Sequence, residues 1–143
     1  MLEKGSLESF IFQTAVYEYP KLQKDLVDGN ILDIYTLDEY DLIITYFNGD
    51  AYMYDSFDHT LEKIKYDSSY ELSDDDILKE FSKRLDKWMR RRGYNQEELS
   101  KLINVSQSSV SKYLNDNQIP NALIIKKIAS VLNIKIDDLY FHF

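Results

Sequence analysis

The 143-residue chain contains no cysteine, two prolines and four glycines. The absence of cysteine excludes disulfides, thiolate metal sites and cysteine nucleophiles. The few glycines form no glycine-rich phosphate loop. The two histidines, His59 and His142, lie far apart in the sequence, and although Asp58 precedes His59, no second metal-like cluster accompanies them. We therefore expect no enzymatic activity, no metal and no cofactor.

Long hydrophobic runs and a secretion signal are missing as well. A membrane-spanning helix needs at least about 18 predominantly apolar residues, and the chain has no such run. The N-terminal segment MLEKGSLESF lacks the order of basic and then apolar residues that marks a secretory signal. With 44% apolar and 29% charged residues, the composition is typical of an ordinary globular protein. We expect a cytoplasmic protein that does not contact a membrane.

Charge is distributed unevenly along the chain, whose formal net charge is −8. Residues 1–72 hold 5 Lys/Arg and 15 Asp/Glu, a balance of −10, whereas residues 77–135 hold 12 Lys/Arg and 5 Asp/Glu, a balance of +7. Such asymmetry is typical of a nucleic-acid-binding segment joined to another module. The polar stretch 66–76 separates the two halves, and Ser73 or Asp74 can cap the helix that follows. We predict two domains, residues 1–70 and 74–143.

The first domain is predicted to be α+β. Helical spacing of apolar residues predicts a first helix with a stripe formed by Leu7, Phe10, Ile11, Ala15 and Val16. Pro20 can start a short second helix, and Gly29 can end it. Three segments, 31–36, 41–47 and 51–57, are rich in β-branched and aromatic residues and predict strands.

A hairpin is predicted at Asn48-Gly49, because this pair favours a two-residue turn. Folding at this turn pairs Ile44 with Met53 and Tyr46 with Ala51 on one face. The opposite face then carries Ile43, Thr45, Tyr52 and Tyr54. Since both faces are apolar or aromatic, the preceding helices can cover one, and the second domain or a second copy of the chain can cover the other. Residues 1–70 are therefore predicted to be an acidic dimerisation or partner-binding domain.

The second domain is predicted to be all-helical, with five short helices. The first ends near Gly93 and carries the stripe Ile77, Leu78, Phe81, Leu85 and Trp88. Asn95 and Glu98 form a capping-box-like start for a second helix with the apolar face Leu99, Leu102 and Ile103. Ser106 caps a third helix, whose inward side chains are Val110, Tyr113 and Leu114. An amphipathic helix follows Pro120, and the segment IDDLYFHF adds one further turn or two.

The outward face of the third helix is unusually polar. It carries Gln107, Ser108, Ser109, Ser111 and Lys112, and no acidic residue lies between Val105 and Asn115. A helix that enters the DNA major groove presents polar side chains at its start, while an apolar minority holds it to its scaffold. The alternative is a helix that merely faces solvent, but in an acidic protein such a helix would usually carry Asp or Glu. The pattern favours DNA binding.

From Leu78 to Phe141 the sequence resembles the helix-turn-helix domain of phage repressors and Cro proteins, the XRE family. The motifs that carry the resemblance are NQEEL, INVSQSSVSKYL and KKIASVLNIKIDDLY. Residues 1–70 resemble no family that we recognise. The resemblance implies a lambda-repressor-like domain of five helices that binds double-stranded DNA sequence-specifically.

The resemblance also implies roles for individual residues. Base-reading positions correspond to Gln107, Ser108, Ser109 and Lys112, and glutamine suits adenine whereas lysine suits guanine. DNA-backbone positions correspond to Gln96, Ser106, Ser111, Asn115 and Asn117. Ser100 stands where the family commonly has alanine, Leu114 where glutamate is common, and Asp116 where glycine is common. Arg90, Arg91 and Arg92 either stabilise the end of their helix through its dipole or reach flanking phosphates.

Two functions agree with these observations. The first is a transcriptional regulator, namely a repressor of phage or mobile-element type that binds an operator as a homodimer through the helix at residues 107–114, with dimer contacts in the N-terminal domain. The second is an interaction protein, an antitoxin or an inhibitor of the anti-CRISPR kind, in which an acidic N-terminal effector domain binds a protein partner and the helix-turn-helix is autoregulatory.

Overall fold

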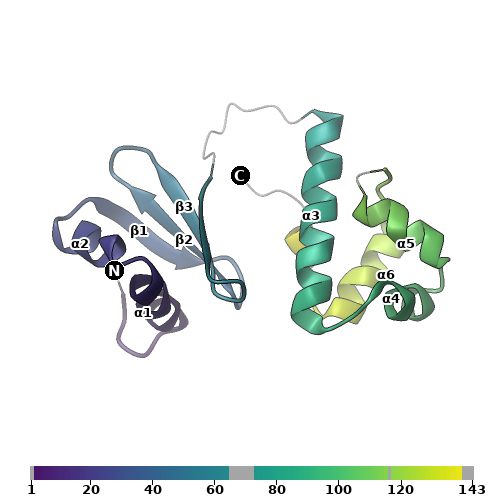
Figure 1. The fold of residues 1–143 in the computed structure, drawn as a ribbon, viewed down its shortest axis with the longest axis horizontal. Coiled ribbons are helices and arrows are strands. Elements are labelled where there is room, and N and C mark those ends of the chain that lie inside the picture. Colours follow the sequence, from purple (N-terminus) through teal and green to yellow (C-terminus); the bar gives the residue numbers. More distant parts are fainter. Residues whose placement is uncertain (1, 65–72, 116, 140–143) are drawn as a thin grey trace. The chain divides into compact units, whose positions relative to one another are not determined.

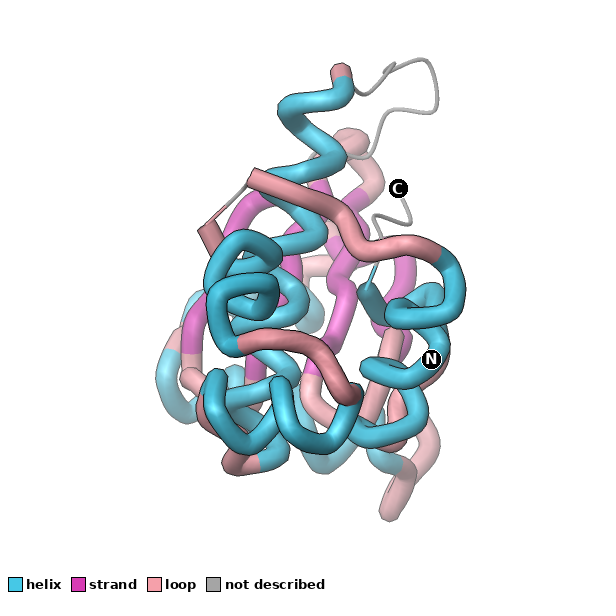
Figure 2. Tube along the Cα trace, turned by 90° about the vertical axis from the view of Figure 1, so that its right-hand side faces the viewer, coloured by secondary structure: helices cyan, strands magenta, loops and turns pink. Residues whose placement is uncertain are grey.

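The computed structural model of the chain describes residues 2–64, 73–115 and 117–139. The chain divides into two compact units at residues 68 and 69. The first unit contains α1 (Leu7–Glu18), α2 (Lys21–Val27), β1 (Ile31–Thr36), β2 (Asp41–Tyr46), β3 (Ala51–Asp55) and β4 (Thr60–Ile64). The second contains α3 (Asp74–Arg92), α4 (Gln96–Ile103), α5 (Gln107–Leu114), α6 (Ala122–Leu132) and a 3₁₀ turn, η1 (Ile136–Leu139). All strands that the structure describes belong to the first unit (Figure 2).

The first unit is a four-stranded antiparallel sheet with two helices on one face. The strands follow one another in the order β1-β2-β3-β4, and α1 and α2 cover part of one face (Figure 1). Phe12 and Ala15 of α1 and Leu22 of α2 form a core with Ile34 and Ile44 of the sheet. The expected α+β architecture is confirmed.

The register of the β2–β3 hairpin differs from the prediction by one residue. Ile43, rather than Ile44, lies opposite Met53, and Thr45 lies opposite Ala51. The turn is one residue longer than predicted, because the Tyr46 N–H bonds to the Asp50 carbonyl at 2.8 Å and closes a three-residue loop. In that loop Gly49 alone has positive φ (93°), which is typical of a three-residue hairpin and not of the Asn-Gly two-residue turn.

The shifted register exchanges part of the predicted faces. Leu42, Ile44 and Tyr54 face the helices and belong to the core. Ile43, Ala51 and Met53, on the alternate positions, are also buried. The central hairpin therefore carries buried apolar side chains on both faces, as its composition predicts.

Two further predictions for the first unit were wrong or incomplete. The buried stripe of α1 is Ile11, Phe12 and Ala15, whereas Leu7 and Phe10 are 46% and 72% exposed. The helix carries apolar residues on nearly every side, so their spacing alone did not identify its inner face.

Strand β4 was not predicted, because its sequence TLEKI mixes polar and apolar residues. Such a mixture is typical of an edge strand, and β4 is an edge strand that pairs only with β3.

The second unit is a bundle in which α3 packs against α5, α6 and η1, and α4 packs against α5 and α6. Its buried side chains include Phe81, Leu85, Trp88, Met89, Leu99, Ile103, Val110, Tyr113, Ile125, Ile128, Leu132 and Leu139. Leu102, predicted to be buried, is 55% exposed. The described part of this unit contains four α-helices, and the fifth predicted helix corresponds to the 3₁₀ turn η1. Tyr140, Phe141 and His142 of the predicted last segment lie outside the described residues.

Within the described ranges, no helix is both long enough and apolar enough to cross a membrane.

Candidate nucleic-acid interface

The site is built on α4, a tight turn and α5. α4 begins with a capping box, in which the Glu98 N–H donates to Asn95 Oδ1 at 2.8 Å and the Asn95 N–H donates to Glu98 Oε1 at 3.3 Å. It ends at Asn104, whose φ of 57° lies in the left-handed region that asparagine tolerates. The Val105 N–H then donates to the Ser100 carbonyl at 3.0 Å, which turns the chain into α5 within two residues.

α5 is held to the bundle by a small buried face. Val110 is fully buried and Tyr113 is 5% exposed. The buried Ser82 hydroxyl of α3 donates to the Tyr113 carbonyl and thereby fixes the C-terminal turn of α5. Ser100 is buried and its hydroxyl donates to the Glu97 carbonyl at 2.7 Å, so serine is accommodated in α4 beside α5 without an unsatisfied hydroxyl. The third predicted inward residue, Leu114, is half-buried.

The opposite face of α5 carries the residues expected to read bases. Gln107, Ser108 and Lys112 are exposed, and none forms a hydrogen bond or ion pair through its side chain with a residue that the structure describes. Ser108 and Lys112 are four residues apart and share one helix face. We call Gln107, Ser108 and Lys112 the exposed α5 surface. Ser109 differs, because it is half-buried and its hydroxyl lies 2.9 Å from that of Ser106.

Residues expected to contact the DNA backbone lie around this surface. Ser106 is the N-cap of α5 and accepts the Ser109 N–H at 3.0 Å. At the other end, the Asn115 amide donates to the Ser111 carbonyl at 2.8 Å and to its hydroxyl at 3.1 Å. Asn117 is exposed.

Gln96 is the first residue of α4, directly after the N-cap residue Asn95, and is half-buried. Asp116 lies outside the described residues. Gln107 and several serines thus lie around the start of α5, where the helix dipole favours anions, and Lys112 lies in its last turn.

The arginine cluster at the end of α3 serves the fold. Arg92 Nε donates to the Leu132 carbonyl at 2.7 Å and so caps the end of α6. Arg91 is 7% exposed, and its guanidinium lies 4.6 Å from the centre of the Trp88 ring. Arg90 Nε pairs with Asp86 at 3.3 Å. Each of the three side chains therefore has a contact within the second unit.

The fold and the position of α5 define a helix-turn-helix DNA-binding domain. Residues 85–139 match the HTH_3 helix-turn-helix family. The uncharacterized HTH-type transcriptional regulator YazB of Bacillus subtilis (strain 168) is 34% identical over 59 residues, which cover 41% of this chain and 86% of that protein. The chain belongs to the HTH_3 helix-turn-helix family.

Two solved structures also match part of this chain. The restriction-modification controller protein C.AhdI from Aeromonas hydrophila is 27% identical, with a TM-score of 0.42, and the match covers 44% of this chain and 96% of that one. The hypothetical transcription factor NHTF from Neisseria is 20% identical, with a TM-score of 0.45, and the match covers 54% and 90%.

Proposed function

We propose that the protein is a repressor, of the kind carried by phages and mobile elements, that occupies a pseudo-palindromic operator as a homodimer. The observation that carries this proposal is the exposed α5 surface, whose three side chains make no hydrogen bond or ion pair with the described residues and belong to a short helix anchored by Val110 and Tyr113. Gln107, Ser108, Ser109 and Lys112 contact base edges. Gln96, Ser106, Ser111, Asn115 and Asn117 contact the sugar-phosphate backbone.

The bonding pattern ranks the residues that we assign to base edges. Ser109 shares a hydrogen bond with the cap residue Ser106, which leaves its hydroxyl less capacity for bases than Gln107 and Ser108 have. Lys112 lies one turn further along the face of Ser108, where an exposed lysine suits guanine. The acidic balance of residues 1–72 opposes DNA phosphates, so the second unit supplies the DNA contacts.

The first unit supplies the dimer contacts. Leu7, Phe10 and Tyr17 recur at helical spacing along α1 and are 46%, 72% and 85% exposed. A stripe of this kind is stabilised when it is covered by a second copy. The double substitution Phe10→Ser and Tyr17→Ser should therefore shift the protein from dimer to monomer in sedimentation equilibrium, with the far-ultraviolet circular dichroism unchanged. A wild-type protein that sediments as a monomer at micromolar concentration contradicts the dimer.

DNA selection followed by affinity measurement tests the proposal. Oligonucleotides selected by the full chain should share a palindrome, and affinity for it should fall steeply with salt, because phosphate contacts release counterions. The double variant Gln107→Ala, Lys112→Ala should lose about tenfold or more in affinity for that site. The matched control is Gln23→Ala, Lys24→Ala, which removes the same two residue types from exposed positions of α2. Equal affinities of the two double variants would refute the site.

A further inference from the structure

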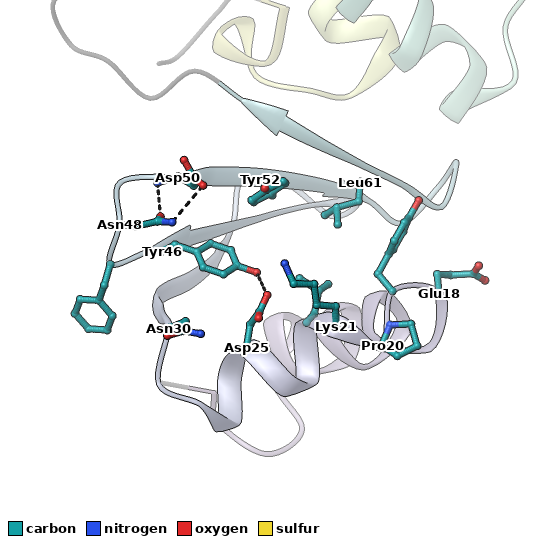
Figure 3. A pocket seen from close by; sticks show the side chains of 13 residues that line it. Glu18, Pro20, Lys21, Asp25, Asn30, Tyr46, Asn48, Asp50, Tyr52 and Leu61 are labelled. Atoms are coloured by element: carbon teal, nitrogen blue, oxygen red, sulfur yellow. Dashed lines mark hydrogen bonds between the residues drawn. The ribbon is translucent and has the colours of Figure 1, made fainter.

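The first unit contains a cleft of about 800 Å³ that the DNA-binding function does not use. It lies where α1 and α2 leave the sheet uncovered, and it is lined from the end of α1, from α2, from the β2–β3 turn and from β4 (Figure 3). Pockets that bind small molecules have volumes of about 300–1,000 Å³ and are mostly apolar with a few placed polar groups. The size of this cleft is within that range.

A carboxylate lies at the floor of the cleft. Asp25 of α2 is 7% exposed, and its Oδ2 accepts the Tyr46 hydroxyl at 2.7 Å (Figure 3). Burial, followed by this hydrogen bond, raises the pKa of Tyr46, so the phenol keeps its proton and remains the donor. Oδ1 accepts no hydrogen bond, and Asp25 forms no ion pair, among the residues that the structure describes. Because Oδ1 is not among the fully buried atoms without a partner, it is open to the cleft and can accept a hydrogen bond from a ligand.

The wall beside Asp25 is aromatic. The Tyr46 and Tyr52 rings meet edge to face, with centroids 5.6 Å apart, and both line the cleft. Leu61 of β4 adds an apolar side chain. An organic cation within about 6 Å of a tyrosine face is attracted by the ring quadrupole. The Asp25 carboxylate and the tyrosine rings therefore both favour a positively charged ligand.

Three further charged side chains line the cleft, Glu18, Lys21 and Asp50. Glu18 is exposed and its carboxylate points away from Asp25 (Figure 3). Asp50 is already paired with Lys63 at 3.3 Å. Lys21 extends over the cleft but forms no ion pair with any described residue. Its ammonium lowers the affinity for a cation, but it has not neutralised Asp25 by contact. Only Oδ1 of Asp25 is available to a ligand. A single N–H donor of an ammonium group therefore suits Asp25 better than a guanidinium, whose paired N–H groups bind two carboxylate oxygens.

We propose that this cleft binds a small primary amine carried on an apolar body. The ammonium donates to Asp25 Oδ1, and the apolar body lies against Tyr46 and Tyr52. The site lies wholly in the first unit, so the proposal does not depend on the DNA contacts of α5.

Titration of the ¹⁵N-labelled full chain with phenethylamine tests the site directly. Saturable amide shifts should map to residues 18–30, 46–52 and 61, and the neutral 2-phenylethanol and the anionic phenylacetate should bind at least tenfold more weakly. Asp25→Asn should weaken amine binding about tenfold or more. The control Asp28→Asn removes the same charge from the exposed C-cap residue of α2 and should leave binding within twofold.

A second variant keeps the test decisive if Asp25→Asn perturbs folding. Lys21→Ala removes the like charge from an exposed position, so amine affinity should rise by about twofold to fivefold. Three results would each overturn the proposal. The first is weaker amine binding by Lys21→Ala than by wild type, the second is equal binding of 2-phenylethanol and phenethylamine, and the third is the absence of any saturable shift with phenethylamine.

Discussion

Asp38 should make the first unit less stable as the pH rises from about 4 to about 7. It lies in the loop between β1 and β2, where its Oδ1 accepts the N–H groups of Tyr40 and Asp41, both at 2.8 Å. Burial first, and then a hydrogen bond and charge repulsion with Asp41, raise the pKa of Asp38 from 3.8 to about 7. The neighbouring Asp41 is 2% exposed, so the two carboxyl groups are stabilised when one holds a proton.

The sign of the effect follows from proton binding. Between about pH 4 and pH 7 the folded state keeps a proton that the unfolded state has lost, so the free energy of unfolding falls as the pH rises across that window. The full pKa difference corresponds to about 4 kcal/mol. Because Asp38 is only half-buried and solvent screens it, we expect about 1–2 kcal/mol.

The perturbation is Asp38→Asn, which retains the Oδ1 acceptor and removes the titration. The variant should match wild type at pH 4 and exceed its unfolding free energy by about 1–2 kcal/mol at pH 8. Urea unfolding followed by tyrosine near-ultraviolet circular dichroism reports mainly the first unit, since nine of the twelve tyrosines lie in residues 1–72. Trp88, the single tryptophan, reports the second unit and should show no change. Parallel pH curves for wild type and Asp38→Asn would refute the reasoning, and Asp28→Asn controls for net charge.

Two further substitutions test the scaffold of the second unit. Ser82→Ala removes the donor to the Tyr113 carbonyl and should lower the free energy of unfolding by about 1–2 kcal/mol in a Trp88 fluorescence titration. An effect no larger than that of the exposed Ser130→Ala would contradict the anchoring of α5. Arg92→Lys weakens the bond to the Leu132 carbonyl and should cost about 1 kcal/mol, with operator affinity changed less than twofold. A tenfold loss of affinity at unchanged stability would instead assign Arg92 to the phosphates.

Local signals in the sequence predicted the helix starts correctly. The predicted N-cap residues of α3, α4 and α5 are observed as N-caps, namely Ser73, Asn95 and Ser106. Ser73 and Asn95 also form capping boxes. These signals are reliable because a cap satisfies backbone N–H groups within three residues of itself. The helix-turn-helix domain was predictable for the same reason, since its turns and caps are local.

Features that depend on tertiary context were predicted less well. The register around Gly49 depended on whether Asn48 also takes positive φ, and it does not. The inner face of α1 depended on which of its many apolar side chains the sheet covers. The cleft around Asp25 was not predicted, because Asp25, Tyr46 and Leu61 come from separate elements and no linear spacing brings them together.

The contact between α5 and base edges is tested most directly by a substitution scan of the selected operator. Each base pair of one half-site is replaced in turn, and the affinities of wild type and Gln107→Ala are measured at one salt concentration. Wild type should discriminate by about 1–3 kcal/mol at the position that Gln107 reads, and the variant should lose discrimination there while keeping it at the other positions. Identical discrimination profiles for the two proteins would contradict the assignment of α5 as the reading helix.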